Sequence, residues 1–417
     1  MKYRVAFLSL HGCPVARLGE KDTGGMNVYL KETAKHLGKL GIKTDVYTRV
    51  HDLNDEEIIP LGINARVIHI KAGEFSHTKE DLHHTGPEFV ENILRFQKKE
   101  NIEYDLVHAH YWLSGYPGIE LSKLWAAPLV STFHTLAKLK LKAKAEEKES
   151  ERRISSESET ILESHGIVVS TESEGRDIKE LYFKSDENFT NSKIRVIPPG
   201  VDLEVFKPGD RSAARNKLGL TNAKMVLYAG RLEPLKGIDI AIEALAKLDT
   251  HEIVNLIVVG GDSTSEDFVV ELKRLAGSLG ISERVKFIGS ISQPELADYY
   301  RAADVLIFPS YYESFGLVAL EAMVSGIPVV ASRVGGLTDL VKNGETGYLV
   351  PFRCAESFTE KLEVILANPS LQEAMGASAR SVAMKCGWKD VAKNLAKFYM
   401  SLSSEFSLES KKIIEIV

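Results

Sequence analysis

The chain has 417 residues, of which 44% are hydrophobic and 26% are charged, a composition close to that of an average globular protein. This length exceeds what one hydrophobic core usually holds, and it predicts two domains of about 200 residues each. The net charge of -6 argues against nucleic acid as the main partner, and no apolar run approaches the roughly 20 residues of a membrane span, so no integral membrane segment is expected.

The amino terminus and the cysteines indicate a cytoplasmic protein. The first residues, Met1–Leu10, are typical of a strand and lack the small-residue cleavage site of a signal peptide. The cysteines have neither metal-ligand spacing nor the density of a disulfide framework. They are Cys13, Cys354 and Cys386. The sequence leaves open whether the chain forms a homodimer.

Short apolar strands alternate with amphipathic helices in the first half of the chain. Periodicity predicts helices over Asn27–Leu40 and Pro87–Glu100. Strands separated by helices of this length form βαβ units and a parallel sheet. The predicted strands are Tyr3–Leu10, Lys43–Thr48, Ala65–Lys71, Tyr104–His110, Pro128–His134 and Gly166–Thr171.

A rigid break at Pro198-Pro199-Gly200 suits a hinge, and a second βα series follows it. Periodicity predicts helices over Ile238–Leu248, Ser265–Leu279 and Trp388–Glu405. The chain is therefore expected to be α/β, with two Rossmann-like domains at about 1–197 and 198–385 and a helical tail at 386–417. The predicted strands are Met225–Gly230, Val254–Gly260, Val285–Gly289, Val305–Pro309, Pro328–Ser332 and Gly347–Val350.

A charged segment, Ala137–Glu159, carries four lysines followed by a run of glutamates. Such a segment is typical of a solvated helix. Because it follows a strand end, where parallel sheets bind ligands, an alternative is a flap over a substrate.

Two carboxylates, Glu313 and Glu321, flank a turn between a predicted strand and a short helix. Glu313 is expected at the carboxyl end of the strand, where open α/β sheets bind ligands. Phe315 and Gly316 open the helix and leave backbone N–H groups that suit an anion. The spacing alone is equally typical of a solvated turn followed by a surface acid.

Two cations, Arg231 and Lys236, follow the strand Met225–Gly230. Cations in such a place stabilise a leaving diphosphate as its charge develops. Their spacing alone is also compatible with two surface cations.

A glycine pair, Gly24-Gly25, precedes the helix that starts at Met26 or Asn27. Paired glycines permit positive φ and a close approach of the backbone to a ligand, although an ordinary turn has the same signature. His108 and His110 form a His-x-His motif, but no third ligand falls at suitable spacing, so zinc is not expected there.

These motifs resemble the retaining glycosyltransferases of family 4, which have the two-domain GT-B architecture with Rossmann-like domains facing a cleft. The resemblance implies that residues 1–197 bind the acceptor, that residues 198–385 bind the nucleotide sugar, and that the helix of 386–417 crosses back to the first domain. The matching features are the E-x7-E pair, Arg231 with Lys236, and the glycine pair. The resemblance implies transfer of a hexosyl unit, glucose or N-acetylglucosamine, from a UDP-sugar. It places Glu321 on the ribose, Glu313 on the donor sugar, and His134 beside the reacting sugar. Further donor-binding residues are expected to be Gly25, Arg231, Lys236, Phe315 and Gly316.

The chain resembles in particular the D-inositol-3-phosphate glycosyltransferases of the mycothiol pathway, and it is also similar to sucrose-phosphate synthases. The segments that carry this are Gly24–Tyr29, His110–Gly115 and His134–Leu136. The implied acceptor is a phosphorylated polyol, most simply an inositol phosphate, with fructose 6-phosphate as the alternative. The phosphate is expected to bind to Lys79, Tyr111, Thr135 and Arg153, and the polyol to His11, Asp22, Thr23, Gly24, Gly25, Met26 and Asn27.

The resemblance implies that the chemistry requires no cofactor, because the chain lacks an Asp-x-Asp metal motif. Some relatives hold a structural cation, here a candidate Mg²⁺ site, through backbone carbonyls. The matching positions are Tyr300, Arg301, Ala303 and Ile327.

Two other classes of protein share parts of this pattern. A nicotinamide dehydrogenase needs a G-x-G-x-x-G turn directly after a strand, which the chain lacks. A hinged, non-catalytic binding protein has no need of two cations at a leaving group.

Overall fold

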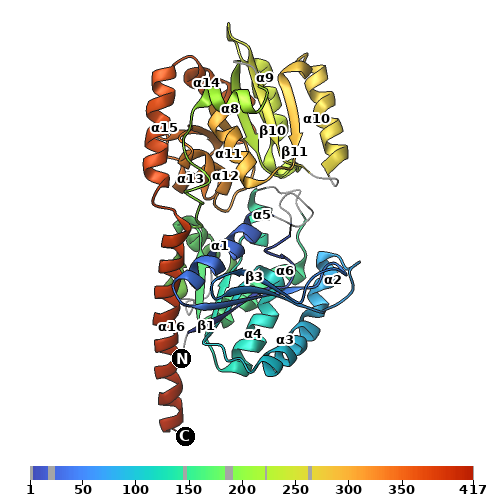
Figure 1. Ribbon diagram of the computed structural model, residues 1–417, viewed down its shortest axis with the longest axis vertical. Helices are drawn as coiled ribbons and strands as arrows, with labels where there is room; N and C mark the ends of the chain where they lie inside the picture. The colour runs from blue at the N-terminus through green and yellow to red at the C-terminus, as the bar shows by residue number, and fades with distance from the viewer. Residues whose placement is uncertain are drawn as a thin grey trace. The chain divides into compact units, whose positions relative to one another are not determined.

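The computed structural model describes residues 3–16, 24–143, 148–183, 191–220, 223–261 and 265–416. Contacts divide the chain into two compact units, drawn in Figure 1. The first unit holds the described residues up to Pro198 together with those from Trp388 onward, and the second unit holds Pro199–Gly387. Both are α/β units built on parallel sheets, so the predicted fold class is confirmed.

The described part of the first unit contains an eight-stranded sheet in the order β3-β4-β2-β1-β5-β6-β7-β8. Neighbouring strands are parallel except for the antiparallel pair β3 and β4 at one edge. The strands are β1 (Arg4–Ser9), β2 (Lys43–Arg49), β3 (Ile58–Gly62), β4 (Ala65–Ile70), β5 (Leu106–His110), β6 (Leu129–Thr132), β7 (Gly166–Val169) and β8 (Ile194–Val196).

Helices cover both faces of this sheet because the strands alternate their apolar side chains between the faces. Phe7 of β1 packs into the core beneath α1 and α16, whereas Leu8 packs into the core beneath α3 and α4. The helices are α1 (Gly25–Lys39), α2 (Lys79–Leu82), α3 (Gly86–Glu100), α4 (Gly115–Trp125), α5 (Ala137–Ala143), α6 (Glu151–Glu163), α7 (Glu172–Tyr182) and α16 (Trp388–Ile416).

The carboxyl-terminal helix α16 is an integral part of the first unit, where it lies beside α1 (Figure 1). Leu395 and Tyr399 are fully buried in the core that α1 and α16 share. A Cβ atom on Gly166 of β7 would come within 2.5 Å of the Phe398 ring, so glycine at this position makes room for the helix. The tail that was predicted to be helical therefore packs on one face of the amino-terminal sheet.

The described part of the second unit contains a parallel six-stranded sheet in the order β11-β10-β9-β12-β13-β14. The strands are β9 (Lys224–Ala229), β10 (Val254–Val259), β11 (Val285–Gly289), β12 (Val305–Phe308), β13 (Val329–Ser332) and β14 (Gly347–Val350). The helices are α8 (Arg211–Lys217), α9 (Ile238–Lys247), α10 (Glu266–Ser278), α11 (Gln293–Ala302), α12 (Leu317–Val324), α13 (Leu337–Leu340), α14 (Ala355–Leu366) and α15 (Pro369–Ala383).

Two predictions about local structure were incomplete or wrong. The edge strand β3 was missed because it contains Pro60, which weakens a strand pattern and is tolerated mainly at sheet edges. The segment Ala137–Glu159 is not one solvated helix, because α5 ends at Ala143, α6 begins only at Glu151, and Glu157 is fully buried. Part of its charge is paired inside the protein, where Arg153 contacts Glu149 and Glu157.

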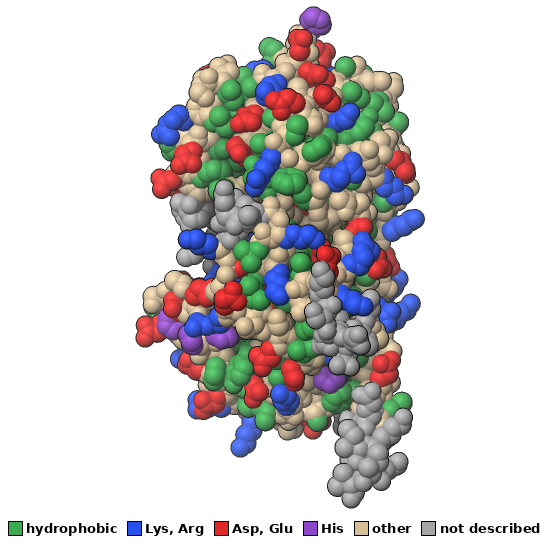
Figure 2. Space-filling model, turned by 180° about the vertical axis from the view of Figure 1, so that it is seen from behind, with side chains coloured by type: hydrophobic (Ala, Val, Ile, Leu, Met, Phe, Trp, Pro, Cys, Tyr) green, Lys and Arg blue, Asp and Glu red, His purple; other side chains and the backbone are tan. Residues whose placement is uncertain are grey.

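The surface agrees with the modest net charge of the chain. On the face drawn in Figure 2, acidic and basic side chains are interspersed rather than gathered by sign. Within the described ranges, no helix combines the length and apolarity that crossing a membrane requires.

Candidate functional site

The sheet of the second unit has a topological switch point between β9 and β12. The chain proceeds outward from β9 to β10 and β11 on one side, and from β12 to β13 and β14 on the other. Ligands of open α/β sheets bind beyond the carboxyl ends of the strands at such a point. Arg231 and Lys236 follow β9, and Glu313 follows β12. The topology therefore brings all three predicted residues to one edge of the sheet.

Lys236 and Glu313 form an ion pair at this edge. The Lys236 Nζ donates a hydrogen bond to Glu313 Oε2 over 2.8 Å, and the two side chains are 17% and 18% exposed. The Arg231 guanidinium is 54% exposed and lies 3.1 Å from the Glu233 carboxylate. The Lys236 and Glu313 side chains are thus mostly buried but still reach solvent. Such groups can give up their mutual ion pair to contact a ligand.

A second glycine pair supports the loop that carries Glu313. The Gly336 N–H donates to the Glu313 carbonyl over 3.0 Å, and a Cβ atom on Gly335 would come within 2.0 Å of that carbonyl. Gly335 also has φ 44°, in the left-handed region that glycine tolerates best. The sequence reasoning missed these residues, although a glycine pair directly after the strand Pro328–Ser332 was a signal.

The helix α12 begins where the sequence predicted it, within one residue. Gly316, with φ 103°, precedes its first turn, and Phe315 is buried. Glu321 lies farther along the helix, and its Oε2 accepts a hydrogen bond from the Tyr300 hydroxyl over 3.0 Å. Burial raises the pKa of Glu321 to about 7, an effect that the Tyr300 hydrogen bond only partly offsets. The carboxyl thus changes its charge near neutral pH.

The first unit has its own switch point between β1 and β5. His11 follows β1 and Tyr111 follows β5, and their rings stack with centroids 5.1 Å apart. Tyr111 and His134, at the carboxyl ends of β5 and β6, have φ values of 68° and 60°. Positive φ is uncommon for such residues and concentrates at functional sites. The two strained residues mark this edge as a candidate site.

Arg153 is the predicted cation of this edge, and it is held firmly. Its Nη2 donates to the Thr135 carbonyl over 3.1 Å and to the Thr135 hydroxyl over 3.2 Å, while its guanidinium lies 5.2 Å from the centre of the Tyr111 ring. Its Nε donates to Glu157 and its Nη1 to Glu149, each over 2.8 Å. Three of the four predicted phosphate ligands are therefore in contact.

The two glutamates were not predicted, and they change the local charge. The side chains of Glu149, Arg153 and Glu157 are 8%, 5% and 0% exposed, so one buried cation lies between two carboxylates. Glu149 also contacts Lys140, with 2.5 Å between the charged atoms. Glu149 lies just before α6, and Arg153 and Glu157 lie on it. The spacing of four residues between successive members of this set was a signal that sequence reasoning did not use.

Lys79, the fourth predicted phosphate ligand, begins the short helix α2. Its neighbour Glu80 accepts a hydrogen bond from Ser150, the capping residue of α6, over 3.3 Å. The Ser150 hydroxyl in turn accepts from the Arg153 N–H. Lys79 is thus beside the amino-terminal end of the helix that carries Arg153.

The predicted polyol-binding segment lies against the loop that follows β1. Asn27 donates from Nδ2 to the Cys13 carbonyl over 2.7 Å and accepts the Gly24 N–H over 3.2 Å. The Met26 methyl group fills the space beside Gly12. Gly25 is the first residue of α1. Asp22 and Thr23, predicted for the same site, lie outside the described residues.

Histidines from adjacent strands form a buried polar row behind this edge. His110 Nδ1 and His134 Nε2 are 3.1 Å apart, and His108 contacts Tyr399 of α16 through Nδ1 over 2.6 Å. Burial lowers the pKa of His134 to about 3, and burial together with neighbouring histidines lowers the pKa of His108 and His110 well below the usual value. All three imidazoles are neutral near pH 7.

Comparisons with known proteins show the family to which the chain belongs. Residues 23–205 match the family model described as Glycosyltransferase Family 4, and residues 210–382 match the model described as Glycosyl transferases group 1. A D-inositol 3-phosphate glycosyltransferase from Corynebacterium jeikeium is 40% identical over 411 residues, covering 96% of this chain and 97% of the relative. The chain belongs to the family 4 glycosyltransferases.

Other members of this glycosyltransferase family match the chain over nearly its whole length. The D-inositol 3-phosphate glycosyltransferase of Corynebacterium glutamicum is 37% identical, covering 95% of this chain and 96% of the relative. Among solved structures, sucrose-phosphate synthase from Thermosynechococcus elongatus has a TM-score of 0.89 and 32% identity, covering 97% of this chain and all of that chain. HepE from Anabaena, at 22% identity and a TM-score of 0.76, shares the fold. The fold of this chain is therefore GT-B.

The predicted structural cation site of the glycosyltransferase lies at the end of α11. Tyr300 and Arg301 belong to the last turn of this helix, and Ala303 follows it. Ala303 and Ile327 pack in the same hydrophobic core. The Tyr300 carbonyl accepts a hydrogen bond from the Ala303 N–H over 3.2 Å. Helix-end carbonyls suit a hard cation, and the Mg²⁺ site remains a prediction.

Proposed function

We propose that the chain is a retaining glycosyltransferase that moves a hexosyl unit, glucose or N-acetylglucosamine, from a UDP-sugar to an inositol phosphate. The supporting observation is the contact of Arg153 with Thr135 and Tyr111 at the switch point of the first unit. A guanidinium, a hydroxyl and a phenol in one place suit a phosphate. The names of the relatives, D-inositol 3-phosphate glycosyltransferases, favour the same acceptor.

In this proposal the second unit binds the donor. The diphosphate lies near Arg231 and Lys236 and near the start of α12, while Glu321 accepts hydrogen bonds from the ribose and Glu313 from the sugar. The Lys236 ammonium then moves from Glu313 to a phosphate oxygen. Because the diphosphate gains negative charge as the sugar leaves, these cations act mainly in the transition state. Solved structures of HepE contain UDP and UDP-glucose, which agrees with a UDP-linked donor.

Transfer with retention follows a front-face route. The acceptor oxygen bonds to the anomeric carbon on the face that the leaving diphosphate vacates, as the bond from that carbon to the phosphate oxygen breaks. The acceptor proton passes to the departing phosphate oxygen. His134, neutral because of burial, serves as a polar partner for the sugar rather than as a cationic acid. Positioning and electrostatics supply most of the acceleration.

The acceptor phosphate binds only after a rearrangement around Arg153. In the structure Glu149 occupies one side of the guanidinium and itself contacts Lys140. A phosphate dianion placed there meets the repulsion of that carboxylate. We propose that Glu149 withdraws from Arg153 when the phosphate arrives, so that Lys79, Tyr111, Thr135 and Arg153 close around it.

The proposed reaction needs no metal ion and takes place in the cytoplasm. The chemistry proceeds without a divalent cation because Arg231 and Lys236 hold the diphosphate. A Mg²⁺ ion at the Tyr300, Arg301, Ala303 and Ile327 carbonyls has a structural role only. We place the enzyme in the cytoplasm, where nucleotide sugars and free thiols occur.

A second candidate is transfer to fructose 6-phosphate, as in sucrose-phosphate synthases. It is favoured by the TM-score of 0.89 with a sucrose-phosphate synthase that is 32% identical. The same phosphate cradle serves both acceptors. Met26, which follows the glycine pair and packs beside Gly12, favours inositol phosphate because glutamine usually occupies its place in the synthases that the sequence resembles.

The test is a screen for UDP release from UDP-glucose and UDP-N-acetylglucosamine. The acceptors are inositol phosphates, hexose phosphates, phosphoglycerate and the unphosphorylated polyols, with the mass of each product as the second readout. Release that depends on an inositol phosphate supports the proposal. Release that depends on fructose 6-phosphate assigns the second candidate, and acceptor-independent release with every compound contradicts both.

A further inference from the structure

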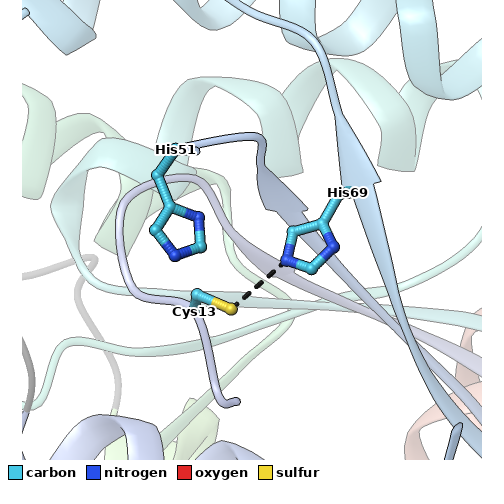
Figure 3. A group of neighbouring side chains, drawn as sticks. All are labelled: Cys13, His51 and His69. Atoms are coloured by element: carbon cyan, nitrogen blue, oxygen red, sulfur yellow. Dashed lines mark hydrogen bonds between the residues drawn. The ribbon is translucent and has the colours of Figure 1, made fainter. Parts of the chain in front are cut away.

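A cysteine and two histidines that are distant in sequence meet in the first unit, as Figure 3 shows. Cys13 lies in the loop after β1, His51 follows β2 and His69 belongs to β4. The donor atoms of the three side chains all lie within 4.8 Å of one another, and Cys13 Sγ is 3.3 Å from His69 Nε2. Neither the spacing of the cysteines nor the His-x-His motif predicted this cluster.

Both histidines are oriented as metal ligands are. His69 Nδ1 lies 2.6 Å from the Glu56 carbonyl, and His51 Nδ1 lies 2.9 Å from Asp55 Oδ2. A carbonyl and a carboxylate only accept hydrogen bonds, so Nδ1 carries the proton in each ring. The nitrogen that each ring offers is therefore Nε2. Metal-bound histidines almost always donate their other N–H to such an oxygen.

The ligand types and burial of the cluster suit a borderline-soft cation. Cys13 and His69 are buried, at 4% exposure each, while His51 lies at the surface. One sulfur and two imidazole nitrogens are a ligand set that Zn²⁺ uses, with a fourth position open to water. Cys13 Sγ and His69 Nε2 are 3.3 Å apart, and the donor atom of His51 lies within 4.8 Å of both. The surface position of His51 gives an ion a way in.

We propose that Cys13, His51 and His69 bind a single Zn²⁺-type ion with a structural role. Binding releases the Cys13 thiol proton to solvent and forms a thiolate–metal bond. The ion then joins the loop after β1 to the ends of β2 and β4. The Cys13 carbonyl already accepts from Asn27, so the same loop is fixed on one side by α1 and on the other by the metal.

The test uses the untagged, full-length protein after treatment with a chelator. Zn²⁺ affinity is measured by competition with a chromophoric chelator, and Co²⁺ is added separately as a spectroscopic probe. The expected results for the unaltered chain are one equivalent of tightly bound Zn²⁺ and a thiolate-to-cobalt charge-transfer band. Zn²⁺ should also raise the melting temperature, because the ion binds the folded state.

Variants assign the ligands. Cys13→Ser should abolish the charge-transfer band and weaken Zn²⁺ binding more than the roughly 10- to 100-fold that loss of an outer partner costs. Asp55→Asn should fall within that smaller range. The matched control is Cys354→Ser with Cys386→Ser, which removes the other thiols and should keep both the band and the affinity.

Two results would overturn the site. One is the absence of stoichiometric Zn²⁺ uptake by the unaltered chain, and the other is uptake that Cys13→Ser leaves unchanged. If Cys13→Ser does not fold, as judged by circular dichroism, His51→Asn replaces it, because the His51 side chain is 39% exposed. Binding unaffected by His51→Asn would then exclude the proposed ligand set.

Discussion

The Lys236 ammonium lies 2.8 Å from the Glu313 carboxylate, and the two residues come from loops that follow the adjacent strands β9 and β12. The ion pair holds the Lys236 ammonium in place at the switch point of the sheet. A diphosphate can take the ammonium while sugar hydroxyls take the carboxylate, so both partners stay satisfied when the donor binds. In the proposed function, this exchange lets two opposite charges that neutralise each other serve as a substrate site.

Replacement of Lys236 by alanine is expected to reduce kcat by about 100-fold or more, because the lost cation acts on charge that grows in the transition state. The measurement is UDP release at saturating donor. The control is Lys247→Ala, which removes a lysine whose ion pair with Glu356 is on the surface and contributes little. Turnover of Lys236→Ala close to that of the control would sink the assignment.

Replacement of Glu149 by glutamine is expected to lower the acceptor KM, because it removes a carboxylate that competes with phosphate for Arg153. Replacement of Arg153 by alanine is expected to raise the acceptor KM far more than the donor KM, since charge-assisted hydrogen bonds contribute about 1.5–3 kcal/mol each. Steady-state kinetics with each substrate varied in turn measures both effects.

The two changes at this cluster must have opposite signs. A rise in acceptor KM with Glu149→Gln would mean that Glu149 holds Arg153 in place rather than competing for it. Equal rises in donor and acceptor KM with Arg153→Ala would point to a general loss of folding, which the melting temperature checks.

Donor binding is expected to strengthen as the pH rises through neutrality. Burial raises the pKa of Glu321 to about 7, so at lower pH the carboxyl is protonated and is a poor acceptor for ribose hydroxyls. Between pH 6 and pH 8 the donor KM should fall by roughly tenfold. The reason is that the ionised fraction of a carboxyl with a pKa of about 7 rises from about 0.1 to about 0.9 over this interval. Glu321→Gln should show a donor KM that is independent of pH in this range, and a pH profile that survives the substitution would assign the titration to another group.

The same carboxyl affects stability with a defined sign. A raised pKa in the folded state means that ionisation above the ordinary value of 4.5 favours the unfolded state. The free energy of unfolding therefore falls as the pH rises from about 4.5 to 7, and above that range the total decrease is about 3 kcal/mol. Urea unfolding of Glu321→Gln should show a smaller loss over this interval than the unaltered chain.

Activity is expected to survive excess EDTA, because Arg231 and Lys236 replace a divalent cation at the diphosphate. The measurement is turnover before and after chelation, followed by addition of Mg²⁺ or Mn²⁺. Complete loss of turnover that Mg²⁺ or Mn²⁺ restores would contradict the assignment of the leaving-group chemistry. Those hard ions do not favour a cysteine–histidine cluster, so the result is independent of the Cys13 site.

The order of strands and helices could be predicted from the sequence because the signal is local. Alternation of Phe7 and Leu8 between two cores, and the helical spacing of Leu395 and Tyr399, are visible in the chain itself. The positions of Lys236 and Glu313 after their strands could also be predicted, because parallel strands place their carboxyl ends at one edge, whereas the ion pair between them was not predicted. The weak edge strand β3 could not, because Pro60 interrupts its pattern.

The contacts that site residues make with partners on other elements were not predicted. Glu321 meets Tyr300 on a different helix, and its raised pKa follows from burial that no spacing reveals. The buried charge network around Arg153 was read as a solvated helix because alternating charge usually faces water. In each case the tertiary fold supplied the partner, and the local sequence carried only the residue type.

A competition experiment tests most directly whether the hexosyl unit is transferred to an inositol phosphate. The enzyme is incubated with a UDP-sugar and equal concentrations of inositol 3-phosphate, unphosphorylated inositol and fructose 6-phosphate, and the products are identified by mass and by the anomeric coupling in their NMR spectra. The expected result is one product, an inositol phosphate glycoside that keeps the anomeric configuration of the donor. A product with inverted configuration, or one formed equally from unphosphorylated inositol, would contradict it.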